Sequence, residues 1–313
     1  MRVALVAVFA MLGLTACAGG GGGGSSAPGT GIAPTAPGVS YTTIRNSPRE
    51  TSYLTASVGL TTTSPALPGG QSSSYRPSIF GYYTVYDSPS TGEFGAVPGD
   101  KFGSNGTSTF TSANLDAAAS NASTVAYTFA LPNGSVSNVR LLNPAPGNPK
   151  IDLSYGSYGQ WQSTTTLLGS VATQETWFVF GAITGDDIPH TGSATYRTAI
   201  DGHWVADGDL RTVVGSGTFS ANFAAGTTQV SLDLNGVSTK TGQAFALGSF
   251  SGSGMIDPAY RAFSGELATT SGSSYKGEYG GFFFGPAAAE AGAVFGLTNG
   301  SGGVVNGVIM GKR

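Results

Sequence analysis

The stretch that decides the fold lies near the C-terminus and reads Gly277-Glu278-Tyr279-Gly280-Gly281-Phe282-Phe283-Phe284-Gly285-Pro286-Ala287-Ala288-Ala289-Glu290-Ala291-Gly292-Ala293-Val294-Phe295. An aromatic strand ends at a Gly-Pro pair, an alanine-rich turn with one acid follows, and a glycine-led strand comes next. Successive side chains of a strand point to opposite faces, so the three consecutive phenylalanines place rings on both faces. Both faces must therefore be covered, as in a barrel wall that also contacts a second layer.

Around this stretch, apolar segments are separated by Gly, Asp and Asn turns. Within them Val230, Leu232 and Leu234 alternate with polar residues, which is the period-two pattern of a strand with one apolar and one polar face. Eight antiparallel strands can close into a barrel without exposed edges, its interior filled by side chains or by a small ligand. The predicted strands cover residues 193–201, 212–223, 228–235, 244–251, 261–268, 276–284, 292–297 and 303–311.

A barrel embedded in a membrane is the alternative to a barrel held outside it. Embedding needs aromatic girdles and an apolar outward band on strands of about ten residues. The predicted strands are mostly shorter, and the N-terminal lipid anchor argued below would be redundant in an embedded protein. The sequence therefore favours the barrel that is not embedded.

The N-terminus predicts a bacterial lipoprotein. Met1-Arg2 gives a positive start, residues 3–14 form an apolar run too short to span a bilayer, and Leu14-Thr15-Ala16-Cys17 resembles a lipobox. That resemblance implies a signal peptide at 1–16 and acylation of Cys17. Several acyl chains on Cys17 would anchor the protein stably to a membrane. Ala18 favours, by analogy with lipoprotein sorting, the outer membrane. The Gly/Ser/Pro-rich segment 17–40 has nothing to bury and is predicted to be the lipidated tether.

Residues 41–185 are predicted to form a β-rich region with less regular strands. Strand candidates include 53–60, 80–86, 124–131, 151–161 and 177–181, while 90–105 is rich in turn residues. Tyrosine and tryptophan offer a large, stiff contact area with a polar tip, which suits binding interfaces, although core packing accounts for most such rings. The binding candidates chosen on this ground are Tyr82, Tyr83, Tyr155, Tyr158 and Trp161.

The C-terminal third carries a resemblance to a family. The stretch 281–295, followed by Gly307-Val308-Ile309-Met310-Gly311-Lys312-Arg313, resembles the closing signature of the β-barrel of bacterial transferrin-binding protein B. It departs from that pattern at Ala293, Ile309 and Met310. The resemblance implies an all-β fold in which a C-terminal eight-stranded antiparallel barrel at 190–313 is preceded by a handle-like region. It also implies an outer-membrane, cell-surface location, an iron source as ligand and an outer-membrane transporter as recipient. Transferrin itself is doubtful, because the chain has room for one lobe and that family has two.

The sequence offers little for catalysis, metals or nucleic acid. A net charge of −3 gives no electrostatic reason to bind nucleic acid, and the single cysteine excludes an internal disulfide. Gly248-Ser249-Phe250-Ser251-Gly252 matches the serine-hydrolase elbow, but no histidine follows His203. His190 and His203, the latter in a predicted turn at 201–204, are interpreted as solvated loop residues rather than haem or metal ligands.

Acidic residues are likewise interpreted as structural. Asp186-Asp187 and Asp207-Gly208-Asp209 lack the further oxygens of a calcium loop and are assigned to turns. Glu290 is expected to cap or pair at the turn between two strands. Arg197 and Glu266 are expected to point outward from their strands.

These observations predict a non-enzymatic, lipid-anchored binding protein of the outer membrane without a cofactor or resident metal. Its ligand would be a protein or a small solute, with an iron or haem source implied by the family resemblance. The alternative is a structural or adhesive surface lipoprotein with no transport role. A barrel packed solid favours the alternative, and an envelope hydrolase is a third, weaker hypothesis that rests on Ser251.

Overall fold

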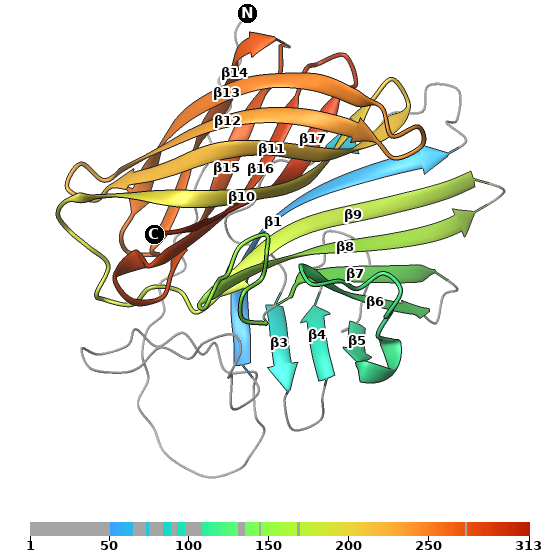
Figure 1. Cartoon of the computed structure of the whole chain (residues 1–313), viewed down its shortest axis with the longest axis horizontal. Coiled ribbons are helices and arrows are strands. Elements are labelled where there is room, and N and C mark those ends of the chain that lie inside the picture. The colour runs from blue at the N-terminus through green and yellow to red at the C-terminus, as the bar shows by residue number, and fades with distance from the viewer. Residues whose placement is uncertain are drawn as a thin grey trace, which may run out of the picture.

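A computed structural model of the 313-residue chain describes residues 51–64, 73–74, 84–88, 93–97, 108–130, 135–143, 145–167, 170–272 and 274–313. Two units make up this part of the chain, a curved sheet and a closed barrel (Figure 1). Cys17, the tether, Tyr82 and Tyr83 lie outside the described residues. Among the described residues no helix has the length and hydrophobicity to span a bilayer.

The C-terminal unit is a closed eight-stranded antiparallel barrel, as the sequence predicts. Each strand pairs with its neighbours in the chain, and β10 closes the ring by pairing with β17. A short 3-10 turn, η4 (Pro286–Ala288), joins β15 to β16. The strands are β10 (Ser193–Ala206), β11 (Asp209–Asn222), β12 (Thr227–Ser238), β13 (Ala244–Asp257), β14 (Ala262–Gly272), β15 (Lys276–Phe284), β16 (Glu290–Thr298) and β17 (Val304–Lys312).

The N-terminal unit is an antiparallel sheet in the order β5-β4-β3-β1-β9-β8-β7-β6, with β2 also paired to β1. Its strand β4 falls within residues 90–105, which the sequence assigned to turns, so that assignment was wrong in part. A 3-10 turn, η3 (Ser112–Asn114), follows β5. The strands are β1 (Thr51–Ser64), β2 (Ser73–Ser74), β3 (Thr84–Ser88), β4 (Glu93–Val97), β5 (Ser108–Thr111), β6 (Thr124–Ala130), β7 (Val136–Leu142), β8 (Gly156–Leu167) and β9 (Ser170–Gly181).

The barrel interior is filled by apolar side chains. Phe283 points inward and stacks near Phe263 and Phe223, with ring centroids 4.9 and 5.4 Å apart. Arg211, near the start of β11, is buried and lies 4.3 Å from the ring of Trp204 and 3.9 Å from that of Phe245. Rings that are at most 2% exposed leave no room for a ligand beside them, so this interior is a packed core.

The outer side of the same barrel wall packs on the sheet. Phe282 and Phe284, which flank the inward Phe283, contact a buried cluster that includes Val58 and Val179 of the sheet. Strands β1, β8 and β9 meet β16 and β17 across this seam. The three consecutive phenylalanines therefore cover both faces of β15, which confirms the arrangement inferred from their spacing.

Two sequence-based expectations about the barrel strands were wrong. The strands are 9 to 14 residues long rather than mostly shorter, so length does not argue against embedding. Polarity does, since β12 buries Val230, Leu232 and Leu234 inside and exposes Gln229, Ser231 and Asp233 outside, the reverse of the transmembrane pattern. In addition, β10 runs unbroken through residues 201–204, where a turn was predicted.

Candidate binding surfaces

The described aromatic candidates lie in the interior of the molecule. Tyr158 and Trp161 are 5% and 7% exposed, and Tyr155 is half-buried. Trp161 packs edge-to-face on Phe129, with ring centroids 5.8 Å apart, in a core on the side of the sheet opposite to Tyr158. Such buried rings do not offer the outward contact area for which they were chosen. Their binding role stays a prediction, and Tyr158 also lines an open cavity described below.

Glu290 joins the barrel to the sheet. Its side chain is 1% exposed and accepts hydrogen bonds from the backbone N–H groups of Ser154, Tyr155 and Gly156 at 2.6, 2.9 and 2.8 Å. Three donors converging on one carboxylate are charge-assisted and hold the ionised form in place. The structural role expected for this residue is correct, but its partners belong to the other unit rather than to the local turn.

A second polar contact crosses the seam at Asp201. Its carboxylate accepts a hydrogen bond from the Tyr158 hydroxyl at 2.5 Å and forms an ion pair with Lys150. Burial, and then the negative charge of Asp201, raises the pKa of Tyr158 far above the usual tyrosine range. Tyr158 therefore acts as a permanent donor that helps to position β10 against the sheet.

His203 is held in the seam by Glu175 of β9. Its Nδ1 lies 2.5 Å from Glu175 Oε2, which also accepts from the Gln160 amide at 2.8 Å, while Oε1 accepts from the Trp177 indole at 2.6 Å. The imidazole is 13% exposed, so the interpretation of His203 as a solvated loop residue was wrong. His190, by contrast, is exposed in the loop before β10.

Beside these contacts the seam opens into a cleft. Two adjoining cavities of about 340 Å³ each share Arg140, Gln160, His203 and Thr212 in their walls. Strands β6, β7 and β8 of the sheet form one side, and β10 and β11 of the barrel form the other. This feature is called the seam cleft below.

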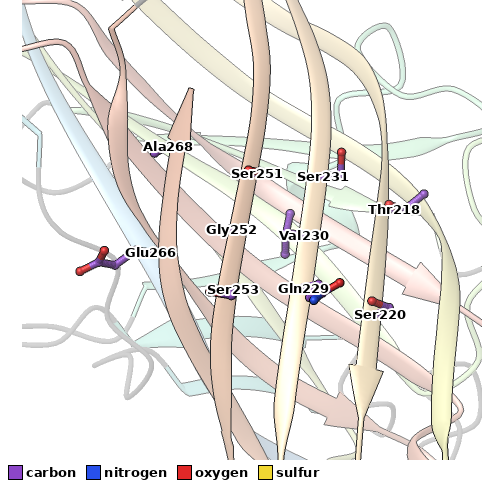
Figure 2. Close-up of a pocket in the computed structure, with 10 residues that line it drawn as sticks. All are labelled: Thr218, Ser220, Gln229, Val230, Ser231, Ser251, Gly252, Ser253, Glu266 and Ala268. Carbon is purple, nitrogen blue, oxygen red and sulfur yellow. The ribbon is translucent and has the colours of Figure 1, made fainter. Parts of the chain in front are cut away.

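A shallow groove of about 520 Å³ runs over the outer wall of the barrel on β11 to β14 (Figure 2). Two rows of directly opposed residues cross it. Thr218, Ser231, Ser251 and Ala268 form one row, and Ser220, Gln229, Ser253 and Glu266 form the next. Glu266 lies at one edge in Figure 2. Glu266 and Arg197 are both exposed, as the sequence predicts.

Within the described residues, the hydrolase and metal-binding alternatives raised from the sequence lack the geometry they require. Ser251 lies in the middle of β13, not at the strand-to-helix turn that a hydrolase elbow requires. In the described part of the chain no three His, Cys, Asp or Glu side chains gather as metal ligands. Asp186 pairs with Arg261, and Asp187 accepts a hydrogen bond from the Ala287 N–H at 2.8 Å, so both have structural partners.

Among the described residues, the most exposed large apolar side chains lie at one end of the barrel. Met255 and Tyr260 are 63% and 58% exposed and belong to the same β13–β14 hairpin. Sequence reasoning missed both, because it placed the end of β13 at residue 251 and so gave no reason to expect Met255 on an exposed strand.

The fold and surfaces define a two-part all-β protein with a sheet packed on a filled barrel. Among solved structures, it is similar to a double mutant of transferrin-binding protein B from Haemophilus parasuis Hp5, with 15% identity over 83% of this chain and 76% of that one, and a TM-score of 0.43. The haemoglobin receptor HpuA from Kingella denitrificans gives 17% identity, 85% and 90% coverage, and a TM-score of 0.38. No protein-family model matches the chain, and no curated protein matches it in sequence. Similarity this distant assigns no ligand.

Proposed function

We propose that the protein is a lipid-anchored binding protein on the outer surface of the bacterial outer membrane, and that it captures a protein without chemically changing it. The lipobox around Cys17 supports the anchor, and the tether supports presentation away from the lipid. The resemblance of the closing signature supports an iron-carrying protein as the ligand, handed on to a membrane transporter.

The filled barrel interior is the observation that supports capture at an outer surface. Phe219, Phe263 and Phe283 are each at most 2% exposed and in mutual ring contact inside the barrel. A solute cannot enter without displacing them, which would cost the burial of several aromatic rings. Recognition then falls to side chains on the outside.

The β13–β14 hairpin is our candidate anchor for a protein ligand. Methionine and tyrosine are enriched in protein interfaces, and a few such residues carry most of the binding energy. Met255 and Tyr260 expose more than half of their surface in this hairpin. A partner that covers both would bury apolar area at little cost in polar desolvation.

The test is a binding measurement with the full chain in detergent against iron-carrying proteins, including transferrin and haemoglobin. We expect saturable binding to one of them, weakened at least tenfold by combined Met255→Ser and Tyr260→Ser substitutions, since such anchors contribute about 2 kcal/mol or more. The matched control replaces Ser251 and Ser253 with alanine on the outer groove and should leave affinity unchanged. Lack of saturable binding to the whole panel would refute the iron-source proposal.

A structural or adhesive role is the second candidate function, and the filled interior favours it as well. Protease treatment of intact cells distinguishes a protein on the cell surface from one on the periplasmic side of the outer membrane, because only a surface protein is cleaved. A surface-displayed chain that binds no iron carrier but promotes attachment of cells to one another or to a matrix would support the adhesive role.

A further inference from the structure

The seam cleft combines unpaired hydrogen-bonding groups from both units. Within the described residues, the side chains of Arg140, Gln162 and Thr212 have no hydrogen-bond or ion-pair partner, and neither has Nε2 of His203. All four residues line the cleft. Ligand sites are typically recesses in which a few polar groups converge, so this arrangement indicates a site for a polar ligand.

The polar floor of the cleft is rigid. Glu175 and Gln160 are 5% and 7% exposed, and the three hydrogen bonds received by Glu175 fix both the indole of Trp177 and the imidazole of His203. Because Nδ1 of His203 faces this carboxylate, Nε2 is the ring nitrogen left for a ligand. A site whose side chains are already held in place loses little conformational entropy when it binds.

Among the described residues, Arg140 is the cation of the cleft wall that has no ion-pair partner. Lys150 is paired with Asp201, and His203 with Glu175. Asp116 is a further carboxylate in the wall of one cavity, and its Oδ1 accepts a hydrogen bond from the Ala119 N–H of its own turn at 3.0 Å. Arg140 is exposed at the wall shared by both cavities, and its guanidinium has the two-pronged donor geometry that matches a carboxylate.

The remaining groups suit hydroxyls. Side-chain amides of Asn138, Gln160 and Gln162 both donate and accept, as a sugar hydroxyl does, and the rings of Tyr127 and Trp177 provide apolar edges. Two adjoining cavities of about 340 Å³ lie within the usual size of small-molecule sites. A ligand with one carboxylate and several hydroxyl groups would use the guanidinium and the amides together.

We propose that the seam cleft binds a carboxylate-bearing saccharide, with its carboxylate on Arg140 and its hydroxyls on Gln160, Gln162, Thr212 and His203 Nε2. The sugar is either a free solute or the terminal unit of a glycan. This site does not depend on the proposed capture of a protein by the β13–β14 hairpin, and substitutions in that hairpin should leave sugar binding intact.

Calorimetric titration of the full chain in detergent with glucuronate, N-acetylneuraminate and glucose tests the proposal. We expect at least one acidic sugar to bind saturably and about tenfold or more tightly than glucose, because the guanidinium pair adds a charge-assisted contact. Arg140→Gln should bring that ratio close to one. Gln162→Ala should weaken acidic and neutral sugars alike by severalfold, since it removes a hydroxyl contact only.

Arg197→Gln is the matched control, because Arg197 is exposed on the same strand as His203 but does not line the cleft. It should change neither affinity nor preference, and circular dichroism should show all variants folded. Failure of both acidic sugars to bind, or a preference that survives Arg140→Gln, would overturn the proposal. A sialylated glycoprotein, before and after sialidase treatment, then distinguishes a glycan end from a free solute as the source of the sugar.

Discussion

Replacing Glu290 with alanine should loosen the junction between the barrel and the sheet more than any surface change. The carboxylate is 1% exposed and receives three backbone N–H groups from residues 154–156. Glu290→Ala leaves all three donors without their acceptor. Glu290→Gln keeps one carbonyl oxygen but turns an amide N–H₂ toward a backbone donor. Its stability should therefore lie between that of the unsubstituted protein and that of Glu290→Ala.

The size of the effect follows from the burial of the donors. The N–H of Gly156 is fully buried, while those of Ser154 and Tyr155 are partly buried. An unsatisfied buried donor costs about 1 to 3 kcal/mol, toward the lower end where water can reach it. Two donors near about 1 kcal/mol and one near about 2 to 3 kcal/mol give a loss of about 4 to 5 kcal/mol in the free energy of unfolding.

Urea unfolding measures this loss, and hydrogen exchange locates it. The amides of residues 154–156 should lose protection in Glu290→Ala, while those inside the barrel wall exchange later. Glu266→Ala removes an exposed carboxylate from the same barrel and should stay within about 0.5 kcal/mol of the unsubstituted protein. Equal stability of the Glu290→Ala and Glu266→Ala variants would refute the assignment of Glu290 as the junction.

Two further predictions concern the barrel core. Phe283→Ala should cost about 3 to 5 kcal/mol in unfolding free energy because it opens a cavity among packed rings, whereas Val214→Ala, 43% exposed, should cost under about 0.5 kcal/mol. Burial raises the pKa of Tyr196 from 10.0 to about 12, although Arg313 partly offsets it, so the folded state holds this proton more tightly than the unfolded state. Stability from this group is complete below pH 10 and is lost as pH rises toward 12, by about 3 kcal/mol. Tyr196→Phe should flatten that pH dependence in alkaline unfolding curves.

Much of the barrel could be predicted from the sequence because its signals are local. The alternation of Val230, Leu232 and Leu234 sets one face of β12, and the run Phe282 to Phe284 requires cover on both faces of β15. The error at residues 201–204 has a physical cause. Asp-Gly usually marks a turn, but Gly202 pairs with Gly307 of the neighbouring strand β17. A Cβ added to Gly202 would lie 2.5 Å from the Asn306 carbonyl oxygen. That glycine allows close approach of two strands rather than a turn.

The polar contacts of the seam could not be predicted because nothing local encodes them. Glu175 and His203 are 28 residues apart, and Lys150 and Asp201 are 51 apart. Glu290 and Ser154 are 136 apart. Each pair exists only because the sheet packs on the barrel in one register. Taken alone, His203 resembles a solvated histidine in a turn, and nothing in the local sequence marks Asp201 as a contact to the sheet.

The seam is mainly apolar along β15 to β17, apart from Glu290 and Asn306, and its contacts through Asp201 and His203 on β10 are polar. The seam cleft lies on this polar side. Phe282, Phe284 and Met310 bury against the sheet and exclude water. Asp201 and His203 instead meet the sheet through hydrogen bonds and ion pairs to Tyr158, Lys150 and Glu175, and the cleft lies beside these polar contacts. Because the apolar half and Glu290 hold the two units together, the polar half can keep unpaired groups without destabilising the junction. A recess maintained in this way is stable when empty and needs no movement of the two units to admit a ligand.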